Sequence, residues 1–319
     1  MKCTVCKGPA VMDVRRHNAA FCSEHFLRLV HQQTQKAIDD FDMIRKGDRV
    51  LVAVSGGKDS LALWDILLKL GYETDGFIIS LGIGEYSKES TQTAQQFAAD
   101  RNLTLHVVDL PEEYGYDIPN GSKAARRTPC SACGLSKRHL IDKAAIDGGY
   151  DVVATGHNLD DEAAVLFGNT LRWNVDYLGR QRPVLPARGG FPKKVKPLVR
   201  LAEREMAAYC VLAGIDYIVE ECPMADGNKH LGYKAALNAI EADSPGSKHA
   251  FFFEFLAKAA VRFEEATDGD DVPEGLGTCT QCGSPASGEV CAFCRLVELA
   301  NRPIPVRIGK TKRLSESPS

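Results

Sequence analysis

The sequence lacks any apolar run that approaches the roughly 20 residues needed to span a bilayer. Its N-terminus also lacks the basic stretch followed by an apolar one that marks a secretion signal. We therefore expect a cytoplasmic protein without membrane contact. Net charge is weak as well: 39 Lys and Arg against 42 Asp and Glu give −3. Any binding to nucleic acid thus has to come from a local basic surface.

Two common nucleotide-binding patterns are missing from the most glycine-rich turn. It is not a Walker A loop, because Lys58 is followed by Asp59 instead of Ser or Thr, and it is not G-x-G-x-x-G. Instead, the apolar run 50–54 leads into Ser-Gly-Gly-Lys-Asp-Ser at 55–60 and then into the apolar-rich segment 61–68. This order predicts a buried strand, a turn and a helix capped by Ser60, with a phosphate at the helix start. The alternative is a plain turn between core elements.

This turn resembles the S-G-G-x-D-S loop of the PP-loop, or N-type, ATP pyrophosphatases, which cleave ATP to AMP and pyrophosphate. All six positions match. The resemblance implies that the turn holds the pyrophosphate of ATP.

An alternation of strand and helix patterns continues after the turn. We expect strands at 76–81, 103–108 and 151–155, and helices at 90–100 and from about 159 to 171. This rhythm predicts an α/β fold with a doubly wound parallel sheet. Ligands bind beyond the carboxyl ends of such strands, so we expect an ATP site formed by Ala53, Val54, Ser55, Gly56, Gly57, Lys58, Asp59, Ser60, Ile79, Gly156 and Asp161.

Within that site, Asp59 and Asp161 are candidate Mg²⁺ ligands. The backbone at Ala53 and Ile79 is placed to meet the adenine edge. The acidic run 160–162 has an alternative reading as a charged first helical turn that satisfies the helix dipole.

Cysteines at the two ends of the chain are paired at zinc-ligand spacing. Thiols kept reduced in the cytoplasm are metal ligands more often than disulfides, and a closed set of four indicates a structural zinc. Two chance pairs of buried cysteines are the alternative at the N-terminus. The expected sets are Cys3, Cys6, Cys22 and His25, and, as a zinc ribbon, Cys279, Cys282, Cys291 and Cys294.

The three central cysteines form an incomplete set. Cys130 and Cys133 open a predicted helix, and Cys222 stands alone before Pro223. Three thiolates suit a [4Fe-4S] cluster with one open iron, while a zinc site with three cysteines or a redox dithiol are alternatives. Lys137, one helical turn beyond Cys133, is placed to lie between cluster and phosphates. Cys210, in a helical pattern, is expected to be a buried core residue.

A basic region follows the central helices, with interspersed aromatic residues. This combination suits looped RNA, but a solvated basic loop is an equal alternative. Helices near 229–241 and 250–265 are expected to cover the sheet or to build a dimer contact. The basic residues are Arg172, Arg180, Arg182, Arg188, Lys193, Lys194, Lys196 and Arg200, and the aromatic ones are Trp173, Tyr177 and Phe191.

The expected parts of the chain are an N-terminal zinc finger at 1–28, a catalytic domain at 29–265, a zinc ribbon at 266–304 and a disordered tail at 305–319. The acidic stretch 264–274 is expected to be a linker.

Taken together, the motifs resemble one subgroup of PP-loop enzymes, the tRNA 2-thiouridine synthetases with two zinc fingers. The matching motifs are CxxC…CxxH, SGGKDS, PCSxCG, GHNLDDEA, the lone Cys-Pro and CxxC…CxxC. The resemblance implies that the terminal sets hold zinc, that Cys130, Cys133 and Cys222 hold the cluster, and that Asp59, Lys137 and Asp161 act at the ATP. It also implies tRNA as substrate, a homodimer, and a ubiquitin-like sulfur-carrier protein ending in a thiocarboxylate.

The expected reaction is ATP-dependent adenylation of the uridine C2 oxygen, followed by sulfur transfer through the open-site cluster. We expect the T-loop 5-methyluridine as the target, with the wobble uridine as the alternative. Three other readings stay open. They are a cysteine persulfide without a cluster, an amide-forming ligase like tRNA lysidine synthetase, and a zinc-finger RNA-binding protein with an inactive nucleotide fold.

Overall fold

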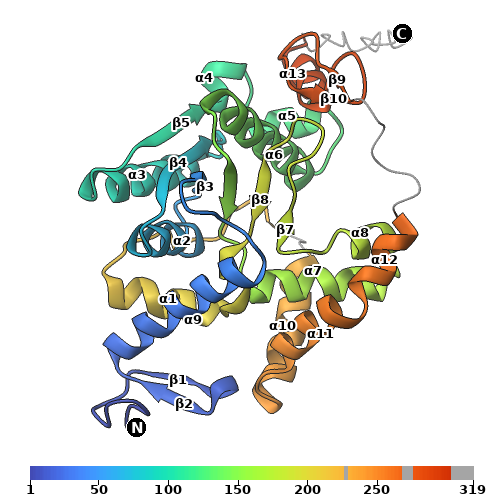
Figure 1. The fold of residues 1–319 in the computed structure, drawn as a ribbon. Helices are drawn as coiled ribbons and strands as arrows, with labels where there is room; N and C mark the ends of the chain where they lie inside the picture. Colours follow the sequence, from blue (N-terminus) through green and yellow to red (C-terminus); the bar gives the residue numbers. More distant parts are fainter. Residues whose placement is uncertain (226–228, 268–275, 303–319) are drawn as a thin grey trace, which may run out of the picture.

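The computed structural model describes residues 1–225, 229–267 and 276–302. Its centre is a six-stranded sheet in the order β5-β4-β3-β6-β8-β7 (Figure 1). All neighbours pair in parallel except β7, which runs antiparallel to β8. The strands are β3 (Arg49–Ala53), β4 (Glu73–Ser80), β5 (Leu105–Asp109), β6 (Val152–Thr155), β7 (Val184–Leu185) and β8 (Lys193–Val195). The predicted parallel sheet is confirmed; the antiparallel edge was not foreseen, because two residues are too short to show a pattern.

Strand β3 shows why the sheet has helices on both faces. Val50 and Val52 belong to one hydrophobic cluster and Leu51 to the other, and all three are fully buried. Alternating apolar side chains of a central strand thus supply two cores. The first face is covered by α1 (Ser23–Asp40), α2 (Lys58–Lys69), α3 (Gly84–Asp100) and α9 (Glu203–Ala213). The second is covered by α6 (Pro129–Gly148), on which α5 (Ile118–Ala124) and α13 (Ala292–Asn301) pack.

The remaining helices connect or extend these layers. Helices α10 and α11 pack on α7, and α12 packs on α8. The single helix expected at 250–265 is two helices that break at Ala259. The bounds are α4 (Leu110–Tyr114), α7 (Leu159–Leu171), α8 (Val175–Gly179), η2 (Pro197–Arg200), α10 (Lys229–Asp243), α11 (Ser247–Lys258) and α12 (Ala260–Thr267).

Two small modules lie at opposite ends of the molecule (Figure 1). The N-terminal one is a hairpin of β1 (Met12–Val14) and β2 (Ala19–Phe21) with η1 (Arg15–His17) between them. The C-terminal one pairs β9 (Gly277–Thr278) with β10 (Pro285–Ala286). Most of the expected acidic linker and the expected disordered tail lie outside the described residues.

Among the described helices, none has the length and apolar character to cross a bilayer.

A buried polar contact ties α9 to α2 under the sheet. The Tyr209 hydroxyl donates to the Asp65 carboxylate at 2.7 Å, and both residues are almost completely buried. Burial raises the pKa of Tyr209 far above its usual range, and the Asp65 charge adds to that shift. The tyrosine therefore stays a neutral donor to a buried anion.

We expect Tyr209→Phe to lower the free energy of unfolding by about 1–3 kcal/mol, because a buried carboxylate loses a charge-assisted hydrogen bond. Urea denaturation measures this. The control is Tyr72→Phe, whose half-buried hydroxyl contacts only the neutral Gln35 amide. Equal losses in the two variants would contradict a special role for the buried charge.

Candidate active site

A cavity of about 460 Å³ opens beyond the carboxyl ends of β3, β4 and β6. This is the place that a doubly wound sheet predicts for a ligand. Of the residues expected at ATP, eight line the cavity: Ala53, Val54, Ser55, Asp59, Ser60, Ile79, Lys137 and Gly156. Gly56, Gly57 and Lys58 belong to the same turn, and Asp161 lies in the first turn of α7.

Two glycines let three backbone segments meet at this cavity. Gly56 has φ +73°, and a Cβ there would lie 2.5 Å from the Ser90 carbonyl oxygen. A Cβ on Gly156 would lie 2.9 Å from the Ser60 nitrogen. Neither position accepts a side chain without a shift of backbone. The loop after β6 therefore lies directly against the first turn of α2.

We expected the hydroxyl of Ser60 to cap α2, but it stabilises the turn instead. It accepts the Ser55 N–H at 3.0 Å and donates to the Gly57 carbonyl oxygen at 3.0 Å. The N-cap residue is Gly57, which has no side chain to accept from the first amides of α2. A helix start of this kind suits an anion.

Three carboxylates and two ammonium groups form a network at the edge of this site. Lys58 Nζ lies 3.1 Å from Asp59 Oδ2 and 2.7 Å from Glu203 Oε1. Lys234 Nζ lies 2.6 Å from Asp161 Oδ1 and 3.0 Å from Glu203 Oε2. The charges of the two lysines therefore offset most of the negative charge gathered beside the phosphate turn.

Burial and pairing shift the pKa values of this network in different directions. Burial raises the pKa of Asp59, with a further contribution from Asp161, although Lys58 opposes it. Burial alone would raise the pKa of Glu203, but its contacts with Lys58 and Lys234 lower it. Burial would lower the pKa of Lys58, yet Asp59 and Glu203 raise it. The lysines therefore stay charged at neutral pH.

Asn158 joins the two candidate magnesium ligands. Its side-chain amide donates to Asp59 Oδ1 at 3.0 Å, and its backbone N–H donates to Asp161 Oδ2 at 3.0 Å. The second contact is half of a capping box at the start of α7. The acidic run can therefore both cap α7 and bind a metal ion, because Asp161 caps the helix through one oxygen and contacts Lys234 with the other.

The structure brings the three central thiols together. Cys130 and Cys133 lie in the first turn of α6, and Cys130 Sγ is 3.7 Å from the Met224 carbonyl oxygen, two residues beyond Cys222. Burial raises the pKa of Cys133; Lys137 opposes this, while Cys222 and Cys130 are close enough to add to it. The same helix carries Lys137 into the cavity.

The distances between ligand atoms distinguish the three central thiols from the two terminal sets. Among the described residues, the only groups whose ligand atoms all lie within 4.8 Å are Cys3, Cys6, Cys22 and His25, and Cys279, Cys282, Cys291 and Cys294. Sulfur atoms on one tetrahedral zinc stand about 3.8 Å apart. The Sγ–Sγ distances of 3.8 Å for Cys6 and Cys22, and of 3.8 Å for Cys282 and Cys291, match this value.

One thiol in each terminal set already favours its metal-binding form. Burial alone would raise the pKa of Cys3 and of Cys279, but backbone N–H donors lower both to about 6. Thiolates are the form that binds zinc, so both modules fit the ion expected from their spacing.

The expected RNA contact of the basic region stays a prediction. Several of its cations are used inside the fold: Lys194 pairs with Asp142 at 2.8 Å, Lys196 with Glu162 at 2.7 Å, and Arg200 with Asp40. The aromatic residues Trp173 and Tyr177 are instead 70% and 62% exposed. A sequence shows charges but not the distant partners that neutralise them.

Sequence reasoning missed three residues of the site. Asn158 had a usable signal, because Asn followed three residues later by Asp is a capping pattern. Glu203 and Lys234 had none. They reach Lys58 and Asp161 only through the packing of α9 and α10.

Comparison with known families gives two matches. Residues 2–27 match the family described as 2-thiouridine synthetase TtuA, N-terminal LIM domain, and residues 27–226 match the PP-loop domain. The first match covers the N-terminal zinc ligands, and the second covers the phosphate turn and the three central cysteines.

Three relatives at 41% to 49% identity carry one name. The chain is 49% identical over 319 residues to the tRNA-5-methyluridine(54) 2-sulfurtransferase of Thermus thermophilus, covering 100% of this chain and 97% of that protein. It is 42% identical over 295 residues to the protein of that name from Pyrococcus horikoshii, covering 92% and 93%.

A solved structure shares the fold. The U34-tRNA thiolase NcsA from Methanococcus maripaludis, solved with its [4Fe-4S] cluster, superposes with a TM-score of 0.75 at 23% identity, over 93% of this chain and 96% of that one. Together with the sequence matches, this assigns the chain to the PP-loop family, among the tRNA-5-methyluridine(54) 2-sulfurtransferases.

Proposed function

We propose that this protein replaces the C2 oxygen of 5-methyluridine 54 in the tRNA T-loop with sulfur, using ATP. One observation carries the proposal: Cys222 meets Cys130 and Cys133 beside the cavity, and the helix of the latter two also carries Lys137 into that cavity. The names of the relatives at 49% and 42% identity support the T-loop target. Proteins named cytoplasmic tRNA 2-thiolation protein 1 are more distant, with 30% identity for that of Drosophila melanogaster.

ATP would lie with its adenine edge against the backbone at Ala53 and Ile79 and its pyrophosphate in the turn 55–60. Asp59 and Asp161 would hold Mg²⁺, since both offer a carboxylate and are joined through Asn158. The start of α2 at Gly57 has no side-chain cap, so its backbone N–H groups can donate to the phosphates.

The uracil C2 carbonyl is a poor electrophile with no leaving group, so its oxygen has to be activated first. Attack of that oxygen on the α-phosphorus forms an O-adenylate and releases pyrophosphate. Lys137 lines the cavity and is positioned to stabilise the developing negative charge. A sulfide then adds to C2, the C2–O bond breaks, and AMP leaves.

Cys130, Cys133 and Cys222 would hold a [4Fe-4S] cluster. Their sulfurs are not all within 4.8 Å of one another, as one ion requires, whereas thiolates on a cluster bind different irons and stand farther apart. Such a cluster supplies an iron with an open position that acts as a Lewis acid for sulfur. The two terminal sets would hold zinc ions that only stabilise their modules.

The rest of the assembly follows from the same family. We propose a cytoplasmic homodimer that receives sulfur from a ubiquitin-like carrier with a C-terminal thiocarboxylate. We also propose that the chain divides into a zinc finger at 1–28, a catalytic domain at 29–265 and a zinc ribbon at 266–304.

An exposed aromatic pair is our candidate tRNA contact. Trp173 has φ +49°, and its N–H bonds to Thr170 O at 3.1 Å where α7 ends, a position that usually takes Gly or Asn. Trp173 is 70% exposed. A strained backbone that presents a large ring to solvent suits base stacking, and Arg172 next to it adds positive charge.

The cluster proposal predicts the metal content of a variant. Anaerobically purified protein should contain iron, acid-labile sulfide and two zinc ions, while Cys222→Ala should keep zinc but lose iron and thiolation activity. The matched control is Cys210→Ala, since Cys210 is a buried core thiol and should leave the iron in place. Iron-free, fully active Cys222→Ala protein would rule the cluster out.

Replacing Trp173 and Tyr177 together by Ala should weaken tRNA binding about tenfold to hundredfold, because stacking contributes about 1–3 kcal/mol per base. Fluorescence anisotropy with labelled tRNA measures this, and ATP binding should not change. Val211→Ala, equally exposed on α9, serves as the control. A variant that binds tRNA normally but sediments as a monomer would assign the pair to a subunit contact instead.

A further inference from the structure

Lys234 occupies the place where a cation would be expected beside the phosphate turn. Its ammonium bridges Asp161 Oδ1 at 2.6 Å and Glu203 Oε2 at 3.0 Å. Its side chain is 21% exposed, and Glu203 and Lys58 link it to Asp59, which lines the cavity. The carboxylate that it contacts most closely is a proposed Mg²⁺ ligand.

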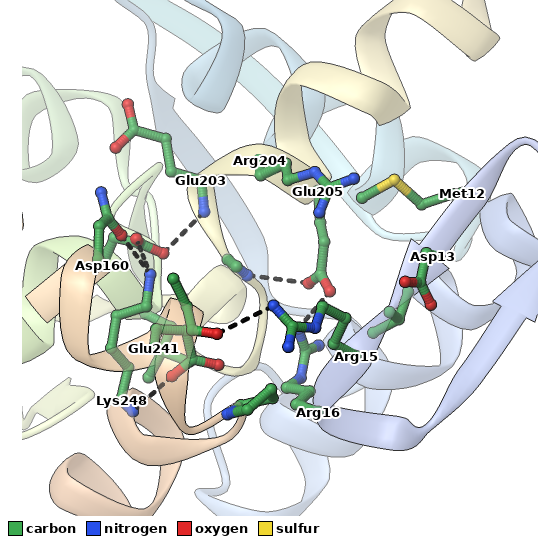
Figure 2. A pocket seen from close by; sticks show the side chains of 16 residues that line it. Met12, Asp13, Arg15, Arg16, Asp160, Glu203, Arg204, Glu205, Glu241 and Lys248 are labelled. Atoms are coloured by element: carbon green, nitrogen blue, oxygen red, sulfur yellow. Dashed lines mark hydrogen bonds and ion pairs between the residues drawn. The ribbon is translucent and has the colours of Figure 1, made fainter.

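A second lysine shows what a purely structural contact looks like here. Lys248 is only 8% exposed in its side chain and pairs with Asp160 and with Asn238 Oδ1 at 2.7 Å. Asp160 also accepts the Glu203 N–H at 2.9 Å, which joins the starts of α7 and α9 (Figure 2). In the same view the Glu203 carboxylate is directed away from Lys248. The two consecutive aspartates thus have different roles: Asp160 makes contacts in the protein interior, and Asp161 faces the site.

Helix α10, which carries Lys234, is packed on α7 by contacts that do not involve Lys234. Tyr233 packs edge-on against Phe167 at 5.8 Å between ring centres, and a Cβ on Gly168 would touch the Tyr233 ring. Arg172 donates to the Tyr233 hydroxyl at 3.0 Å. Because α10 is anchored on α7 by its neighbour, the flexible stem of Lys234 is free to reorient.

We propose that Lys234 binds the β- and γ-phosphates of ATP, and that Asp161 and Glu203 hold its ammonium until Mg²⁺ arrives. This inference rests on the ATP-dependent function proposed above. Mg²⁺ on Asp161 needs the oxygen that Lys234 now contacts, and two cations at one carboxylate repel each other. The displaced ammonium then meets the nearest unpaired negative charge, which is that of the phosphates.

The proposal predicts opposite effects on two ligands. Lys234→Met should weaken Mg·ATP binding to the purified protein about tenfold to hundredfold, and leave AMP binding within twofold, since AMP lacks the outer phosphates. Without nucleotide, Mn²⁺ followed by electron paramagnetic resonance should bind the variant more tightly, because a competing cation is gone. The control is Lys229→Met, an exposed lysine at the start of the same helix.

The outcomes distinguish a wrong inference about Lys234 from a wrong proposed function. If Lys234 only ties α10 to α7, Lys234→Met will lower the thermal midpoint and weaken ATP and AMP equally, and the inference is wrong. Equal ATP affinity in wild type and variant overturns it as well. A wild-type protein that binds no ATP would instead overturn the proposed function, whatever Lys234 does.

Discussion

The site depends on the contact between two backbones, the loop that follows β6 and the first turn of α2. A Cβ at Gly156 would lie 2.9 Å from the Ser60 nitrogen, so only a glycine lets the segments approach this closely. The approach places Asn158 within hydrogen-bond distance of Asp59, at 3.0 Å, and brings Asp161 to the same side. A wider gap would leave one carboxylate on each loop and no shared place for the proposed magnesium ion.

Three carboxylates close together repel each other, and two lysines from different parts of the fold offset this repulsion. Lys58 comes from the phosphate turn itself, and Lys234 comes from a helix added after the sheet is complete. Behind them, Lys248 neutralises Asp160 in the interior, where an unpaired charge would cost several kcal/mol. The site is therefore close to neutral before a ligand enters. A metal that enters such a site has to displace a cation and not merely fill a space.

Local features of this protein could be predicted from its sequence, while features made by packing could not. The strand, turn and helix around Ser55 are encoded by neighbouring residues, and so are the cysteine pairs at the two ends. The parallel sheet followed from the alternation of patterns, but its two-residue edge strand did not. Ser60 was given the wrong role because a cap and a turn contact need the same hydroxyl. The sequence did not show that Lys196 is paired, because its partner Glu162 lies 34 residues away. Lys234 gave no signal at all, since its partners come from α7 and α9.

Helix α6 explains how thiol chemistry and phosphate chemistry can share one site. Cys133 and Lys137 are four residues apart, so they lie on one face of the helix, one turn from each other. The thiol lies close enough to Cys222 to feel its charge, and Lys137 lines the cavity, so helix geometry instead of a loop fixes the distance between Cys133 and Lys137. A loop would allow that distance to vary as ATP binds and pyrophosphate leaves. Because the helix cannot stretch, the thiol of Cys133 stays one helical turn from the ammonium of Lys137.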